Sequence, residues 1–171
     1  MKKTSCLAAV LTAFFCGGCW FMQAPVNRPS EIYDLAPAQP VNKQLCQFAR
    51  IRNLSPAGRK MLYRHPDNRM TEGPASWVQP PETLLQRALE SRFQAGTAAP
   101  EITVSLLRFE LDLAAKQAVL TAELTLPAKK TEYRGDFTAP LTDNSGAAAS
   151  RAMSECVEKL ANLIITMIQE K

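Results

Sequence analysis

Residues 101–137 read EITVSLLRFELDLAAKQAVLTAELTLPAKKTEYRGDF. Apolar and polar side chains alternate along most of this stretch, which is typical of β-strands with one face on a core and the other in water. The apolar positions change parity near Leu107-Arg108, as a β-bulge would cause. A turn at Pro127-Ala128 precedes the last segment. The stretch therefore predicts a three-stranded antiparallel meander with one covered face.

Two helices are predicted to cover that face. Pro80-Pro81-Glu82-Thr83 opens the first helix, because proline suits the first turn and Glu complements the positive end of the helix dipole. Gly96 is expected to end this helix as a left-handed cap. The last helix is predicted over residues 143–169, with Asp, Asn or Ser as its N-cap. Leu163 and Ile165 widen its apolar stripe, which indicates either deep burial or contact with a partner or another copy.

Short strands are predicted ahead of the first helix. They fall at residues 32–35, 44–53, 60–64 and about 69–71, with turn residues between them. Together with the meander they predict an α+β fold, in which two main helices pack on a mixed, mostly antiparallel twisted sheet to form an αβ sandwich. Trp77 stands just before the first helix and is predicted either to plug the core or to contact a partner.

The N-terminal residues have the pattern of an export signal that ends in a lipid-bearing cysteine. Lys2-Lys3 is followed by an apolar stretch at 6–16 and by Gly17-Gly18 before Cys19. The apolar stretch is too short for a helix across a hydrocarbon core of about 30 Å. We therefore expect cleavage between Gly18 and Cys19, and N-acyl and S-diacylglycerol groups on Cys19. A plain secretory signal is the alternative.

Cleavage after residue 18 of 171 would leave 153 residues, enough for one domain. The predicted organisation is a signal peptide at 1–18, a lipid anchor and proline-rich tether at 19–43, and a domain at 44–171. Trp20 follows the cysteine where lipoproteins kept on the inner membrane carry Asp. The expected location is the outer membrane, on its periplasmic face; the inner membrane and the cell surface are the alternatives.

The charge pattern argues against a nucleic-acid partner. Without the two signal lysines the chain has 18 basic and 16 acidic side chains, and the basic residues are scattered rather than gathered in a stripe. His65 is the only histidine, and no Gly-rich phosphate loop or nucleophile elbow is present. The sequence therefore predicts no enzyme activity, no cofactor and no metal site.

Two cysteines besides Cys19 remain after cleavage, Cys46 and Cys156. Export places them in an oxidising compartment, where a disulfide between them would close a long loop and contribute up to about 4 to 5 kcal/mol. Two buried free thiols that behave as small apolar side chains are the alternative. The spacing of the two residues does not decide between these readings.

Several segments, taken in order along the chain, are similar to a known family. They are Ile32-Tyr33-Asp34-Leu35, Met61-Leu62-Tyr63-Arg64, Trp77-Val78-Gln79-Pro80-Pro81 with Leu84-Leu85 and Leu89, Val104 to Phe109, Ala118 to Leu126, and Met153 to Ile164. This order and spacing resembles the auxiliary lipoproteins of ABC-type transport systems, which include the paraquat-inducible outer-membrane lipoprotein that works with mammalian-cell-entry (MCE) transport proteins.

The resemblance implies a non-catalytic role. A lipid-anchored periplasmic domain of this kind would dock a lipid or solvent transport complex, with MCE and ABC-transporter proteins as partners, to the membrane. It could also form a homo-oligomer. Three other functions stay open at this stage. One is a periplasmic carrier with an apolar cavity lined by residues such as Leu106, Leu124 and Ile164, and another is a surface-exposed lipoprotein that faces a host. The third, a hydrolase that acts on envelope polymers, would need carboxylates that converge in a cleft.

Overall fold

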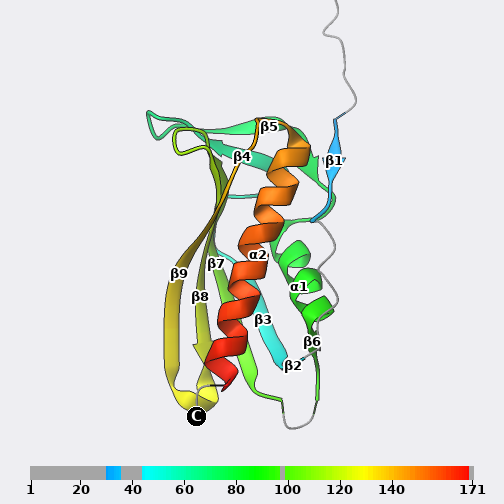
Figure 1. Ribbon diagram of the computed structural model, residues 1–171, viewed down its shortest axis with the longest axis vertical. Helices are drawn as coiled ribbons and strands as arrows, with labels where there is room; N and C mark the ends of the chain where they lie inside the picture. Colours follow the sequence, from blue (N-terminus) through cyan, green and yellow to red (C-terminus); the bar gives the residue numbers. More distant parts are fainter. Residues whose placement is uncertain (1–29, 36–43, 97–98, 170–171) are drawn as a thin grey trace, which may run out of the picture.

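The computed structural model describes residues 30–35, 44–96 and 99–169 of the chain (Figure 1). Their elements, in chain order, are β1 (Ile32–Tyr33), β2 (Gln44–Leu45), β3 (Gln47–Asn53), β4 (Lys60–Arg64), β5 (Met70–Trp77), α1 (Pro81–Arg92), β6 (Phe93–Gln94), β7 (Glu101–Asp112), β8 (Gln117–Leu126), the 3-10 turn η2 (Pro127–Lys129), β9 (Thr131–Pro140) and α2 (Gly146–Gln169).

The described strands form a seven-stranded mixed sheet in the order β1-β5-β4-β7-β8-β9, with β3 also paired to β7. β8 takes one edge of β7, so β3 and β4 share the other edge, where they pair with different halves of the strand. The longest pairings, β7–β8 and β8–β9, are antiparallel, as is β4–β5, whereas the pairings β1–β5, β3–β7 and β4–β7 are parallel. Two helices lie on one face of this sheet (Figure 1), so the predicted α+β fold class is confirmed.

The meander predicted from residues 101–137 is present as β7, β8 and β9, with its bulge at the expected place. Leu106 pairs with Ala122 and Arg108 pairs with Thr121, which leaves Leu107 as the extra residue. The inward side chains of β8 are each at most 1% exposed: Ala118, Leu120, Ala122, Leu124 and Leu126. The opposite face of the sheet, which we call the outer face, carries mainly polar and charged side chains.

Helix α1 begins as predicted, with proline in its first turn and Glu82 beside the N-terminal end. It does not end at Gly96. The helix stops at Arg92, and Phe93 turns into extended backbone, because its buried side chain packs edge-on against Phe48 with the ring centroids 5.4 Å apart. Described glycines have no positive φ, so Gly96 has no capping role.

Helix α2 covers β8 and β9 (Figure 1). Its N-cap is Ser145, whose Oγ accepts a hydrogen bond from the Ala148 N–H at 3.1 Å. Leu163 and Ile165, the residues that widen the apolar stripe, lie partly buried against the core. No helix in the described part of the chain combines the length and the apolar character needed to span a bilayer.

The N-terminal strands differ from the prediction in three respects. The short return strand expected at about 69–71 is longer and runs to Trp77, because β5 pairs with β4 on one side and with β1 on the other. The single strand expected at 44–53 is interrupted at Cys46, because β2 pairs with β6 and β3 pairs with β7. β1 lies within the stretch expected as a tether, yet it pairs with β5. The buried Ser150 of α2 also donates a hydrogen bond to the carbonyl oxygen of Asp34. The folded domain therefore includes residues 30–35.

Candidate docking site

Of the residues predicted to act at a site, Gly18 and Cys19 lie outside the described part of the chain, as does the signal at 1–18. Trp77 lies at the end of β5 and is 1% exposed. Its ring meets that of Phe109 edge-on, with the centroids 5.3 Å apart. Trp77 is thus a core residue in this structure rather than an exposed contact.

Cys46 and Cys156 are both buried and free. The residue after Cys46 pairs with Glu101, at the first end of β7, whereas Cys156 donates its thiol hydrogen to the Ala118 carbonyl oxygen (3.6 Å), opposite Leu111. Glu101 and Leu111 are about 33 Å apart along the strand at about 3.3 Å per residue. Bonded cysteines need Cα atoms within about 7 Å. The fold therefore excludes a disulfide between Cys46 and Cys156. The alternative prediction, two buried free thiols, describes the structure.

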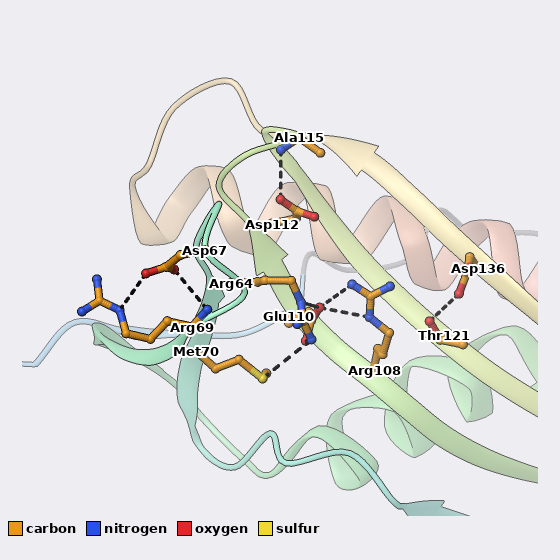
Figure 2. A network of polar contacts seen from close by, with 10 residues as sticks. All are labelled: Arg64, Asp67, Arg69, Met70, Arg108, Glu110, Asp112, Ala115, Thr121 and Asp136. Atoms are coloured by element: carbon orange, nitrogen blue, oxygen red, sulfur yellow. Dashed lines mark hydrogen bonds and ion pairs between the residues drawn. The ribbon is translucent and has the colours of Figure 1, made fainter.

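The outer face carries a charge cluster centred on Glu110, which Figure 2 shows. Arg64 of β4 makes a bidentate contact with this carboxylate, with Nε–Oε1 at 2.6 Å and Nη2–Oε2 at 3.0 Å. Arg108 of β7 donates to the same Oε1 through its Nε at 3.0 Å. The Glu110 side chain is only 1% exposed, because the two arginines cover it. The Arg64 and Arg108 side chains, 25% and 36% exposed, are therefore held in place at the surface by one carboxylate.

The pKa of Glu110 reflects two opposing effects. Burial alone would raise it, because a desolvated carboxylate is less stable than a carboxylic acid. The hydrogen bonds from Arg64 and Arg108 outweigh that cost, so the pKa of Glu110 lies below its ordinary value. The same contact, opposed by partial burial, raises the pKa of Arg64. Glu110 and Arg64 are therefore both charged at neutral pH.

Two more arginines extend the positive charge across β3. Arg50 pairs in register with Thr103 and Arg52 with Ser105, so both point to the outer face, opposite to the inward Ile51. Both are exposed, and neither makes an ion pair within the described residues. The part of the outer face built from β3, β4 and β7 is consequently rich in arginine.

The other side of the outer face, on β8 and β9, is richer in carboxylates. Glu123 lies 3.5 Å from Arg134, with both side chains largely exposed. Asp136 of β9 accepts a hydrogen bond from the Thr121 hydroxyl (Figure 2). Glu132 follows the same alternation and points the same way. The outer face therefore has a basic part and a mixed acidic part, which suits electrostatic docking of another macromolecule.

The described residues contain no cluster of three or more His, Cys, Asp or Glu side chains that would suit a metal ion. His65 lies in the turn between β4 and β5, where its Nε2 is 2.8 Å from the Thr71 hydroxyl. Its role there is a local polar contact within the hairpin.

The carrier alternative requires an apolar cavity between sheet and helices. Leu106, Leu124 and Ile164, the residues predicted to line it, are each at most 1% exposed and belong to one packed core cluster. Two open hollows near the ends of the sheet have volumes of about 270 Å³ each and carry charged side chains such as Glu90 and Glu132. Packing at the predicted cavity argues against a lipid-carrying interior.

The Glu110 cluster was not predicted from the sequence. One local signal was available, because Arg108 and Glu110 are two residues apart and therefore share a face of one strand. The third member, Arg64, lies 46 residues away in the chain and is brought in only by the parallel pairing of β4 with β7.

No family model and no curated protein matches this sequence. Solved structures match the fold. A crystal structure of an uncharacterized protein superposes with a TM-score of 0.68 at 13% identity, covering 83% of this chain and 100% of that chain. A crystal structure of protein XCC0632 from Xanthomonas campestris, of the family DUF330, superposes with a TM-score of 0.57 at 16% identity, covering 78% of this chain and 92% of that chain. These identities show a shared fold alone.

Proposed function

We propose that this chain is a lipid-anchored, non-catalytic auxiliary protein of an ABC-type, MCE-linked transport system, held at the periplasmic face of the outer membrane. The observation that carries the proposal is the fold shared with the DUF330 structure, in a chain whose N-terminus has the pattern of a lipoprotein signal. DUF330 proteins are similar to the ABC-type transport auxiliary lipoproteins that the order of segments in this sequence resembles.

The work of such a protein is tethering. The described domain begins at Ser30, eleven residues after Cys19, a length of chain that spans at most about 40 Å when fully extended. Acyl chains on Cys19 would hold the protein on the bilayer, since each buried methylene contributes about 0.8 kcal/mol. An anchor this close raises the local concentration of the domain at the membrane, so a modest contact with a transport protein is sufficient.

The outer face of the sheet is the surface we assign to that contact. Arg50 and Arg52 are exposed without an ion pair in the described chain, and Arg64 and Arg108 are held in place by Glu110. The single carboxylate of Glu110 does not balance the four arginines, so an acidic surface on the transport protein would complement the remaining positive charge and speed its association. We assign no catalytic step to this surface.

Lipidation of Cys19 is tested by replacing it with Ala, with Cys6→Ala in the signal as the matched control. We expect the wild type and the control to yield a mature N-terminal peptide that carries diacylglycerol and an acyl chain, detected by mass spectrometry, and to fractionate with the outer membrane. The Cys19→Ala chain should lose both properties. An unmodified N-terminus in the wild type would overturn the anchored adaptor.

Partner identity is tested by mild crosslinking in intact cells followed by purification of the wild type and of an Arg50→Glu/Arg52→Glu variant. We expect an MCE or ABC-transporter protein with the wild type and a severalfold lower yield with the variant. An Arg151→Glu variant changes an exposed charge on α2, away from the outer face, and serves as the control. If no transport protein is recovered with the wild type, the assignment to a transport system is wrong.

A further inference from the structure

β9 is the last strand of the sheet, and no described residue pairs with its free edge (Figure 1). Most of its residues are exposed from Thr131 to Asp136. An edge strand offers its unpaired N–H and C=O groups to a further strand. The Nζ of Lys159 on α2 donates to the Thr138 carbonyl at 2.6 Å, and so occupies only one end of β9.

We propose that β9 pairs antiparallel with β9 of a second copy of this chain, about a two-fold axis at Gly135. In this register Arg134 lies opposite Asp136 of the second copy, and Tyr133 lies opposite Phe137 of the second copy. The two-fold axis repeats both pairs, so four favourable cross-strand pairs flank a central pair of glycines. The two sheets would join into one continuous sheet.

The charges of β9 favour this register over the two registers that lie two residues to either side. Moving the pairing two residues in one direction places Arg134 opposite itself, and moving it two residues in the other direction places Asp136 opposite itself. A shift of one residue would set outward side chains against inward ones. Of these three same-face registers, only the one centred on Gly135 opposes Arg134 to Asp136; the register centred on Tyr133, a further step away, would oppose Glu132 to Arg134 and leave Asp136 out of the charge pairing.

The side chains on the inward face of β9 also fit the register centred on Gly135. Tyr133 is 41% exposed, which makes it one of the few large apolar side chains in the described chain that are not covered. Its ring lies over Gly135, where a Cβ would be 2.7 Å from the tyrosine Cε1. Gly135 therefore leaves room for the Tyr133 ring of its own chain, and in the proposed register each Tyr133 ring would lie beside Phe137 of the second copy.

The contacts that Arg134 and Asp136 make within one chain leave both side chains able to form ion pairs with a second copy. Arg134 is 3.5 Å from Glu123, and the two side chains are 66% and 45% exposed, so that ion pair is weak. Asp136 uses one oxygen to accept the Thr121 hydroxyl and keeps its second oxygen for a guanidinium. The rival reading is that these charges protect the edge against any pairing.

Charge reversal separates the two readings. Purified mature Arg134→Asp would oppose acid to acid, and Asp136→Arg would oppose base to base, so each variant alone should self-associate at least about tenfold more weakly than the wild type. An equal mixture of the two variants opposes acid to base at both positions. We expect this mixture to form a one-to-one heterodimer, measured by sedimentation in detergent solution.

Arg50→Asp makes the same charge change on β3 and should remain dimeric. A wild type that is monomeric throughout the concentration series would overturn the proposal, as would variants that dimerise unchanged or a mixture that fails to associate.

A second measurement does not depend on the folding of the charge variants. The double variant Arg134→Cys/Asp136→Cys should form intermolecular disulfides under oxidation, and Arg134→Cys alone should not; the absence of crosslinks in the double variant would also count against the pairing.

Discussion

At the scale of single residues, Glu110 shows how a charge can be buried on a face that meets water. Its carboxylate is covered by the two arginines that neutralise it, so the desolvation cost is offset by charge-assisted hydrogen bonds. The arginines in turn lose part of their side-chain freedom. The ion pairs with Glu110 therefore order two guanidinium groups on the outer face before an acidic surface binds there, so less side-chain entropy is lost on binding.

Glu110→Gln should lower the free energy of unfolding at pH 7 by about 2 kcal/mol, because a neutral amide accepts weaker hydrogen bonds from the two guanidinium groups. The loss should depend on pH. The folded pKa of Glu110 lies below its ordinary value of 4.5, so its contribution is present above that value and disappears as pH falls through the folded pKa. Urea unfolding between neutral and acid pH measures both effects.

Glu123→Gln is the matched control, because Glu123 is 45% exposed and its nearest cation is 3.5 Å away. It should change stability by less than about 0.5 kcal/mol. Equal losses for the two variants, or a loss for Glu110→Gln that grows as the pH is lowered, would contradict the role given to the cluster.

At the scale of elements, the ends of the helices depend on different interactions. Helix α2 begins where Ser145 caps the Ala148 N–H, a local interaction that sequence analysis can anticipate. Helix α1 ends where Phe93 is drawn into the core against Phe48, a contact between residues 45 positions apart. Local signals thus place the start of α2, and tertiary packing places the end of α1.

Ser145→Ala should destabilise the domain by about 1 kcal/mol, because the first turn of α2 would lose a side-chain acceptor. Ser145→Asp keeps an acceptor and adds a negative charge at the N-terminal end of the helix, so it should retain wild-type stability. Thermal unfolding followed by circular dichroism distinguishes them. If alanine and aspartate at this position gave the same midpoint as the wild type, the cap would have no energetic role.

At the scale of the whole molecule, the long strand β7 keeps the two internal cysteines, Cys46 and Cys156, apart. Cys46 lies near the first end of β7 and Cys156 lies near the other end, so a disulfide between them cannot crosslink the domain. The core must supply the stability instead. One cluster of buried apolar residues, shared by both helices and the sheet, does so.

Cys46 and Cys156 should therefore react as free thiols only after unfolding. Burial raises the pKa of each thiol to about 12, so the native protein contains almost no thiolate at pH 8. We expect iodoacetamide to label neither residue in the native protein and both residues in urea without reductant, as read by peptide mass spectrometry. Labelling that requires a reductant would show that the thiols are bonded.

The sequence by itself determined the meander, its bulge near Leu107-Arg108, both main helices and the α+β class. These features follow from short-range patterns: alternation along strands, helical spacing of apolar residues, and capping residues next to the elements they start. It also determined the expectation of a lipid anchor at Cys19, which lies outside the residues that the structure describes.

Only the tertiary structure decided which strands are neighbours. The parallel pairing of β4 with β7 brings Arg64 to Glu110, the pairing of β1 with β5 adds residues 30–35 to the domain, and the length of β7 keeps Cys46 from Cys156. It likewise leaves β9 at the edge. The physical reason is that such contacts join residues far apart in the chain, whose pairing is set by the packing of the whole core and leaves no periodic signal in the local sequence.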